Sequence, residues 1–247
     1  MSGHSKWSTI KRKKAVIDAK RGKIFTKVLR EITVAARMGG GDTANPRLRA
    51  ALQDARANNV PSDTIERAVQ KGTGELEGVA YDEVVYEGYA PCGVAVLVET
   101  MTDNRNRTAG EVRHVFSKHG GNLGENGCVG WMFDQRGYFV IERQSLDEEA
   151  FFELAVELGV EDIDTEGDGY EVFTSPADYN RVKEMLSERA ITVEVGELAM
   201  IPQNTVEVEA SKQRQVLRLL EALEELDDVQ NVWASFDPSG LDANAED

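Results

Sequence analysis

The chain has 247 residues, of which 41% are hydrophobic and 29% are charged, a mixture typical of folded globular proteins rather than disordered ones. Its formal net charge is -16, and no apolar run approaches the roughly 18 residues that a membrane-spanning helix needs. Two cysteines without CxxC spacing, Cys92 and Cys128, favour a reduced, cytoplasmic protein over a disulfide-stabilised secreted one.

The charge is divided unevenly along the sequence. Residues 1–72 contain 16 Lys and Arg against 6 Asp and Glu, a net charge of +10. The remainder has 12 basic and 38 acidic residues, a net charge of -26. The total alone would argue against a polyanionic partner, but its distribution predicts that the first third binds a polyanion while the rest repels it.

The basic character is strongest in residues 2–27, where Asp18 is the only acid. Residues 11–14 are four consecutive cations, and Trp7 just before them could stack on an exposed base. The predicted nucleic-acid-binding residues are therefore Lys6, Trp7, Lys11, Arg12, Lys13, Lys14, Lys20, Arg21, Lys23 and Lys27. A solvated tail, a nuclear-import peptide, a mitochondrial presequence and a membrane-surface patch are the alternatives, although the apolar face that a membrane helix needs is missing.

Three helices are predicted between residues 21 and 72. In the first, Phe25, Val28, Leu29 and Ile32 recur at helical spacing, and glycines at 39–41 end it. Pro46 fits the first turn of the second helix. Ser62 or Asp63 is expected to cap the third helix, with Glu66 completing a capping box. Arg30, Arg37, Arg47, Arg49, Arg56, Arg67 and Lys71 extend the basic character over these helices.

Strand periodicity begins after Tyr81. A hairpin is predicted from residues 83–89 and 93–100, followed by a helix over 103–121 and strand-like residues at 128–133. The pattern from 137 to about 201 is β-α-β-β-α-β, and strands at 205–209 and 229–236 flank a helix at 210–228. We therefore predict an α+β fold, in which an N-terminal helical domain precedes two ferredoxin-like split βαβ domains, one inserted in the other.

The corresponding domain boundaries are a flexible basic arm at 1–20, a helical domain at 21–78, a discontinuous α/β domain at 79–132 plus 204–238, an inserted α/β domain at 133–203, and an acidic tail at 239–247.

A second candidate anion site lies at the strand-to-helix junction "TDNRNRT". Arg105 and Arg107 lie near a helix N-terminus, where a cation is unfavourable unless an anion offsets it, and Arg113 is the third residue of this candidate site. A carboxylate such as Glu99 or Glu111 could do so as well as a phosphate. Asp103 or Asn104 is the expected N-cap.

No catalytic, metal-binding or cofactor-binding motif was found, so the sequence favours a protein that is not an enzyme and needs no cofactor. The three histidines lack metal-ligand spacing, and no Walker loop, GxSxG or GxGxxG occurs. The glycines of "HGGNLGENG" follow a predicted helix instead of preceding one, so they indicate a tight turn rather than a phosphate-binding loop.

Several segments together resemble the YebC family. They include "GHSKW", "DAKRGKIFTK", "NNVPSDTIERAVQKGTG", "YEGYAPCGVAVLVE", "TDNRNRT", "GGNLGENG" and "MIPQNTVEV". Members are described as probable transcriptional regulatory proteins, and similar proteins activate translation, including a mitochondrial activator of a cytochrome oxidase subunit and factors that relieve ribosomes stalled on proline runs. The resemblance implies three domains and no agreed catalytic residues. The chain departs from it at Ala90 and Cys92, where the family often has glycine.

These observations predict a cytoplasmic regulator of gene expression that binds DNA through its basic N-terminal region. A translation factor that binds ribosomal RNA or the ribosome is the alternative, and the sequence does not choose between them. An acidic scaffold that binds a basic protein partner is a further alternative. No membrane partner is expected.

Overall fold

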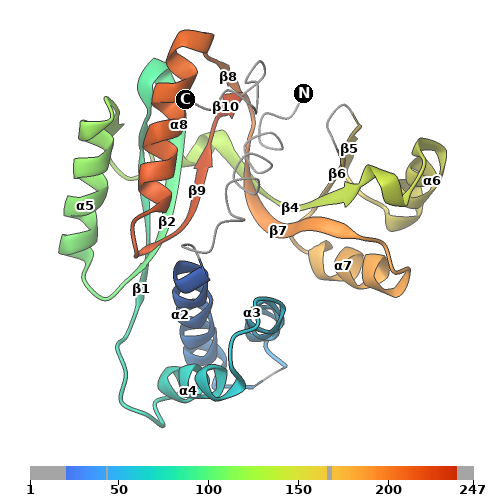
Figure 1. Ribbon diagram of the computed structural model, residues 1–247, viewed down its shortest axis with the longest axis horizontal. Helices are drawn as coiled ribbons and strands as arrows, with labels where there is room; N and C mark the ends of the chain where they lie inside the picture. Colours follow the sequence, from blue (N-terminus) through green and yellow to red (C-terminus); the bar gives the residue numbers. More distant parts are fainter. Residues whose placement is uncertain (1–20, 43, 166–168, 238–247) are drawn as a thin grey trace.

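The computed structural model describes residues 21–42, 44–165 and 169–237, and in it the chain forms three lobes (Figure 1). The helical lobe consists of α2, α3 and α4. The first-sheet lobe is built on the strand order β3-β1-β2-β9, and the second-sheet lobe on the order β5-β6-β4-β7. The predicted α+β fold class is therefore confirmed.

The helical lobe forms where the sequence places its apolar periodicity. Its helices are α2 (Arg21–Gly39), α3 (Pro46–Ala57) and α4 (Ser62–Thr73). Ile32, Leu48 and Ala55 are fully buried in its core, with Phe25 and Val28 packed against them. Pro46 begins α3 as predicted, and the Asn45 side chain caps that helix by accepting a hydrogen bond from the Arg47 N–H.

The predicted capping box of the third helix is wrong. Helix α4 begins at Ser62, and the N-cap is Pro61, which makes no side-chain capping bond. The Pro61 carbonyl instead accepts bonds from the backbone N–H groups of Thr64 and Ile65. Since proline fixes φ near its helical value, the helix begins before Asp63 reaches a capping position.

The first-sheet lobe joins segments far apart in the sequence. Its elements are β1 (Asp82–Tyr89), β2 (Ala95–Thr102), α5 (Arg105–Lys118), β3 (Asn122–Leu123), α8 (Ala210–Glu224) and β9 (Val229–Ala234). The predicted β1–β2 hairpin is present and antiparallel, and β9 pairs with β2. Helices α5 and α8 cover one sheet face over a core that includes Phe116 and Leu219. A short parallel pair, β8 (Val206–Glu207) and β10 (Phe236–Asp237), lies beside it.

The second-sheet lobe has the predicted β-α-β-β-α-β chain order. Its elements are β4 (Phe133–Glu142), α6 (Glu148–Leu158), β5 (Asp162–Asp164), β6 (Gly169–Thr174), α7 (Tyr179–Glu188) and β7 (Val193–Pro202). Every strand pairing is antiparallel, and the order β5-β6-β4-β7 is that of a split βαβ unit. Phe139 and Phe151 anchor its helix-covered core.

The two sheets pack against each other through the faces that their helices leave open. Leu97 and Trp233 of the first sheet belong to the same buried cluster as Tyr138 and Phe173 of the second. The domain boundaries remain a prediction, but this shared core fixes the two sheet lobes relative to one another.

Residues 128–133, predicted as strand-like, form a strand only at their end. Gly130–Met132 is a short 3-10 helix, and β4 begins at Phe133. The cause lies 40 residues earlier, because the carboxylate of Glu87 accepts the N–H groups of Gly127, Val129 and Gly130 at 2.7–2.8 Å. These donors are therefore unavailable to a sheet ladder or to a phosphate. The glycine-rich segment forms turns, as predicted, but they lie on either side of the short strand β3, which was not predicted.

Candidate nucleic-acid interface

The predicted binding residues divide at the start of α2. Lys6, Trp7, Lys11, Arg12, Lys13, Lys14 and Lys20 lie outside the described residues. Arg21 is the first residue of α2. Only Lys23 and Lys27 can be followed as side chains, and the structure brings both to one place.

Lys23 and Lys27 lie four residues apart, on the face of α2 that is turned toward the first-sheet lobe. The Lys23 ammonium donates to the carbonyl oxygen of Glu225 at 2.6 Å, and that of Lys27 to the carbonyl oxygen of Gln230 at 3.2 Å. Both side chains are half-buried. In this arrangement they hold two lobes together instead of projecting freely into solvent.

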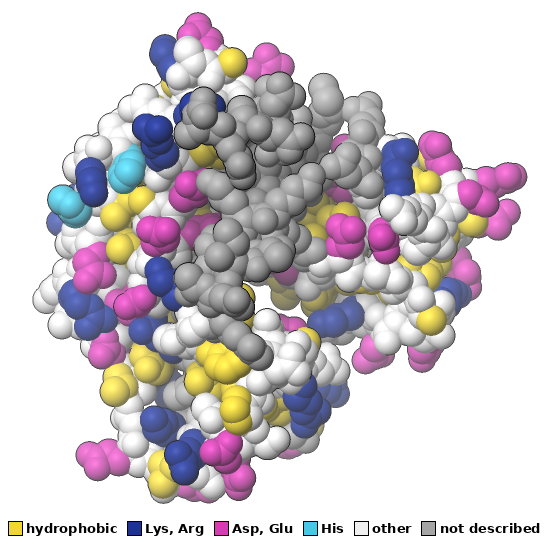
Figure 2. All heavy atoms as spheres, viewed as in Figure 1, with side chains coloured by type: hydrophobic (Ala, Val, Ile, Leu, Met, Phe, Trp, Pro, Cys, Tyr) yellow, Lys and Arg dark blue, Asp and Glu magenta, His cyan; other side chains and the backbone are white. Residues whose placement is uncertain are grey.

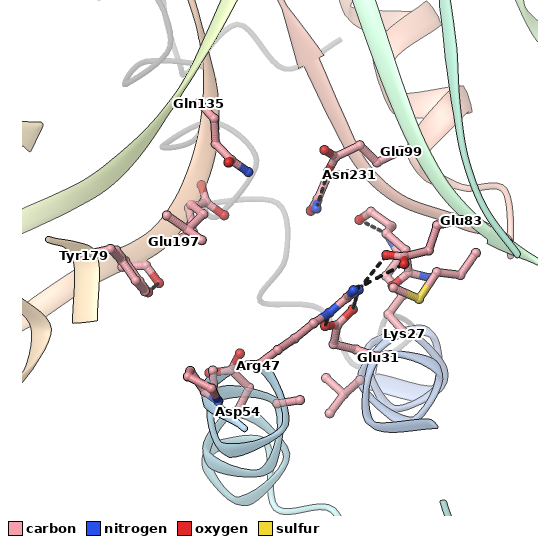
Figure 3. Close-up of a pocket in the computed structure, with 18 of the residues that line it drawn as sticks. Lys27, Glu31, Arg47, Asp54, Glu83, Glu99, Gln135, Tyr179, Glu197 and Asn231 are labelled. Atoms are coloured by element: carbon pink, nitrogen blue, oxygen red, sulfur yellow. Dashed lines mark hydrogen bonds and ion pairs between the residues drawn. The ribbon is translucent and has the colours of Figure 1, made fainter. Parts of the chain in front are cut away.

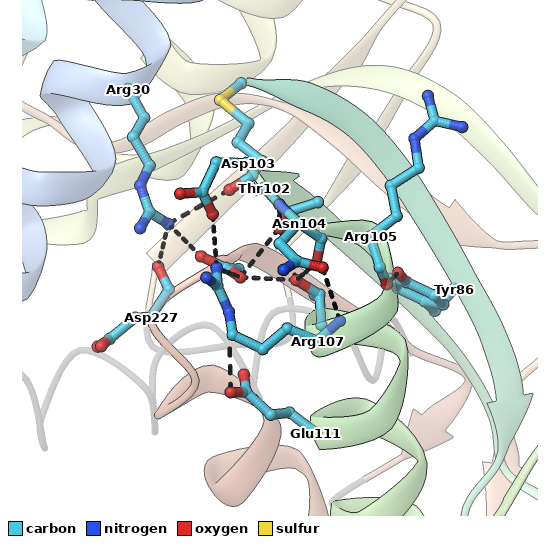
Figure 4. A network of polar contacts seen from close by, with 12 residues as sticks. Arg30, Tyr86, Thr102, Asp103, Asn104, Arg105, Arg107, Glu111 and Asp227 are labelled. Carbon is cyan, nitrogen blue, oxygen red and sulfur yellow. Dashed lines mark hydrogen bonds and ion pairs between the residues drawn. The ribbon is translucent and has the colours of Figure 1, made fainter. Parts of the chain in front are cut away.

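Arg30 continues the same helix face and makes the most contacts (Figure 4). Its guanidinium donates to the backbone carbonyls of Asp227 and Met101 and pairs with the Asp228 carboxylate at 3.1 Å. It also lies 5.3 Å from the ring centroid of Tyr81, a cation–π distance. The sequence grouped Arg30 with the basic surface, whereas here it is a structural contact.

Asp228 is the centre of this network. Its carboxyl group is nearly fully buried and accepts hydrogen bonds from the Thr102 hydroxyl at 3.1 Å, the Thr108 hydroxyl at 2.6 Å and the Arg107 guanidinium at 2.7 Å. Burial alone would raise its pKa, but the bonds from Thr108 and Arg107 and the charges of Arg30 and Arg107 outweigh it, so the pKa is lowered. Sequence reasoning missed Asp228, because its partners are between 120 and 198 positions away.

The second candidate anion site is occupied by the protein's own carboxylates. Arg107 pairs with Asp103 and Asp228, both at 2.7 Å, and lies 3.9 Å from Glu111. Arg105 pairs with Asp82 at 2.9 Å. Asn104 caps α5, as one of the two predicted alternatives. Since these acids offset the charge at the helix N-terminus, an anionic ligand is not needed there.

Arg113 is the third arginine of that candidate site. Its side chain is exposed, and it forms no ion pair with any residue that the structure describes.

A different set of cations on the helical lobe does face solvent. Arg49 and Arg56 lie seven residues apart on α3, and Arg67 and Lys71 lie four apart on α4, so each pair shares one helix face. All four are exposed and have no ion pair within the described part of the chain. We call Arg49, Arg56, Arg67 and Lys71 the exposed cation group.

The balance of charge differs between the lobes. Figure 2 shows dark-blue and magenta side chains together on the helical lobe, at the bottom of the view, whereas the charged side chains at the outer end of the second-sheet lobe are mostly magenta. A polyanion that approaches the molecule is therefore attracted to one end and repelled by the other.

Arg47, expected to belong to the basic face, is turned inward instead (Figure 3). It pairs with Glu31 and with Glu83, each at 2.6 Å. The bond to Glu31 raises the pKa of Arg47 further above its ordinary value, against the effect of burial. Glu83 is in β1, so Arg47 forms a further link between the helical lobe and the first-sheet lobe.

The three lobes surround a cleft of about 820 Å³ (Figure 3). Its lining has more carboxylates than cations: Glu31, Asp54, Glu83, Glu99 and Glu197 against Lys27, Arg47 and Lys183. Desolvation raises the pKa of Asp54, and the nearby charge of Lys183 opposes that effect. An acid-rich cleft disfavours a polyanion, so the exposed cation group is the better candidate surface.

None of the described helices is both long enough and apolar enough to cross a membrane. Residues 21–42, 44–165 and 169–237 also contain no cluster of three or more histidine, cysteine, aspartate or glutamate side chains arranged to hold a metal ion.

The chain matches relatives over almost its whole length. It is 57% identical over 238 residues to a "probable transcriptional regulatory protein" of Desulfatibacillum aliphaticivorans, with 96% of each chain covered. It is 56% identical over 240 residues to a protein of the same description from Geobacter sulfurreducens, with 97% of each covered. The crystal structure of a conserved hypothetical protein from Aquifex aeolicus superposes with a TM-score of 0.82 at 48% identity, covering 90% of this chain and 92% of that one.

Two family models divide the sequence between them. Residues 5–75 match the TACO1/YebC protein N-terminal domain, and residues 81–236 match the TACO1/YebC second and third domain. The junction of the two matches falls in the linker between α4 and β1. The resemblance noted in the sequence is confirmed, and the chain belongs to the TACO1/YebC family.

Proposed function

We propose that the protein is a nucleic-acid-binding regulator of gene expression that contacts phosphates through its basic N-terminal region. The observation that carries this proposal is the charge segregation: a net charge of +10 over residues 1–72 on a chain of net charge -16. The exposed cation group lies within that basic third. The names of the relatives as probable transcriptional regulatory proteins support the regulatory role, and they favour a function other than catalysis.

The proposed mechanism is directional docking. The cations of residues 6–20 and the exposed cation group neutralise phosphates and release counterions, which provides affinity without sequence selectivity. The acidic sheet lobes stay away from the phosphate backbone, because like charges repel. Their surfaces remain available to a protein partner.

Salt dependence tests this mechanism. If six cations engage duplex DNA, the logarithm of the affinity falls against the logarithm of salt concentration with a slope of about −5, near −0.9 per phosphate. Changing residues 11–14 to glutamine should lower both the affinity and the slope. A matched control changes Lys118, Lys183, Lys212 and Arg218 of the sheet lobes to glutamine, with the same change in net charge. Equal effects of the two variants, or an affinity independent of salt, would contradict the proposal.

The choice between DNA and the ribosome needs a separate measurement. Lysate is sedimented through a sucrose gradient with the full chain and with a chain lacking residues 1–20. Co-migration with ribosomes that requires residues 1–20 would assign a translational role. Free sedimentation together with arm-dependent retardation of promoter DNA would assign a transcriptional one.

A further inference from the structure

The interface between the helical lobe and the first-sheet lobe differs from the interface between the two sheets. The apolar core of the helical lobe contains only residues between Phe25 and Val69, and none from either sheet lobe. Hydrogen bonds and ion pairs cross from this lobe to the first-sheet lobe, and their donors are Lys23, Lys27, Arg30, Arg37 and Arg47. The two sheets, in contrast, share a buried apolar cluster.

Three of these cations converge on one short segment, the α8–β9 turn, which we define as residues 225–230 and which includes the first two residues of β9. Their acceptors there are the backbone carbonyls of Glu225, Asp227 and Gln230 and the carboxylate of Asp228. Helix α8 ends at Glu224, so the turn also carries the partial negative charge of a helix C-terminus. Lys23, Lys27 and Arg30 therefore dock on backbone carbonyls and one carboxylate that the protein itself supplies.

The covalent connection between these lobes permits movement. Residues 74–80, which join α4 to β1, are exposed throughout the segment. Gly74 has a φ of 83°, in the left-handed region that glycine adopts without strain. A polar interface with an exposed linker separates more readily than a shared apolar core, because water and salt replace its contacts.

We propose that Lys23, Lys27 and Arg30 form a latch that closes the helical lobe onto the α8–β9 turn and withholds these cations from polyanions. The inference rests on the proposed nucleic-acid-binding function and adds a regulatory step to it. A phosphate competes with the turn for the same donors, so nucleic acid binds the open form more tightly than the closed form. By linkage, any change that weakens the latch strengthens nucleic-acid binding.

Lobe opening is measured directly by fluorescence energy transfer. Dyes are attached at Ser62→Cys on α4 and Ser117→Cys on α5, both exposed, in a chain carrying Cys92→Ser and Cys128→Ser. Arg30→Met is compared with Arg218→Met on α8, which removes the same charge from an exposed site outside the proposed interface. The latch predicts lower transfer in Arg30→Met than in Arg218→Met, and a further decrease when a short DNA duplex or RNA hairpin is added.

Binding is then measured for the same two variants. Both lack one cation of the natural chain, and Arg218 is not part of the proposed interface, so tighter binding by Arg30→Met reports the latch. If the latch keeps about nine tenths of the molecules closed, Arg30→Met binds the duplex up to about tenfold more tightly than Arg218→Met. A second pair of variants leaves the buried Asp228 contact intact. Glu83→Gln weakens the ion pair with Arg47, and Glu66→Gln makes the same charge change at an exposed position of α4. Glu83→Gln should shift transfer and affinity in the same direction as Arg30→Met, by a smaller amount.

The outcomes separate the latch from the proposed function. Equal transfer in Arg30→Met and Arg218→Met, together with equal transfer in the two glutamate variants, overturns the latch. Lower transfer in Arg30→Met without tighter binding than Arg218→Met overturns the coupling. If no form retains nucleic acid but transfer still falls in Arg30→Met, the proposed function has failed while the polar lobe contact stands.

Discussion

Two groups of lysines and arginines on the helical lobe have opposite surroundings. Lys23, Lys27 and Arg30 of α2 dock on the turn after α8, whereas the exposed cation group of α3 and α4 meets solvent. Every member of both groups adds one positive charge to the first third of the chain. The comparison shows that a basic segment in a sequence combines cations that stabilise the fold with cations that can bind a ligand, and only their neighbours distinguish them.

The largest expected effect comes from Asp228, the buried carboxylate that pairs with Arg30. Asp228→Asn leaves Arg30 and Arg107 without their buried anion, so we expect the free energy of unfolding to fall by about 3 kcal/mol. Asp103→Asn, which removes an exposed partner of Arg107, should cost less than about 1 kcal/mol. Denaturant unfolding of both variants measures the difference. An equal loss of unfolding free energy in the two variants would mean that Asp228 does not hold Arg30 in place.

The pH dependence of that stabilisation follows from the lowered pKa of Asp228. A carboxyl whose folded pKa is below its unfolded pKa stabilises the fold above the unfolded value, here an ordinary 3.8, and loses that contribution as the pH falls through the folded pKa. We therefore expect the stability difference between the natural chain and Asp228→Asn to be full at neutral pH and to shrink below about pH 4. A difference that grows on acidification would show that the sign of the pKa shift is wrong.

Substitutions in the exposed cation group should weaken nucleic-acid binding and leave the stability of the fold unchanged. Arg49→Gln with Arg56→Gln should reduce the slope of log affinity against log salt by about 1.8, near 0.9 for each phosphate that is no longer neutralised. The free energy of unfolding should stay within about 0.5 kcal/mol per substitution. Lys118→Gln with Arg218→Gln is the matched control on the first-sheet lobe, where no change in slope is expected. If both pairs of substitutions reduced the salt slope equally, the helical lobe would not be the preferred site of phosphate binding.

The smallest effect is expected at Arg105, whose ion pair with Asp82 is exposed at both ends. Arg105→Gln should change the free energy of unfolding by less than about 1 kcal/mol, because solvent and salt screen such pairs. Affinity for nucleic acid should be unchanged if this site is not part of the interface. If Arg105→Gln lowered the affinity as much as the double substitution of Arg49 and Arg56 does, Arg105 would belong to the nucleic-acid interface.

Local features of the fold could be predicted from the sequence, and long-range polar contacts could not. The apolar face of α2, the start of α3 at Pro46 and the cap of α5 at Asn104 depend on residues within a few positions of each other. Glu87 and Asp228, in contrast, act on segments 40 or more residues away. The pairing of a lysine with a backbone carbonyl leaves no mark in sequence spacing, which is why the docked cations were grouped with the exposed ones.

Chemical acetylation of lysines, followed by mass spectrometry, tests the division of the cations most directly. In the free protein, the exposed amine of Lys71 should react faster than those of Lys23 and Lys27, which donate to backbone carbonyls. Addition of nucleic acid should protect Lys71. Equal reactivity of the three lysines in the free protein, or no protection of Lys71 by bound nucleic acid, would contradict the account.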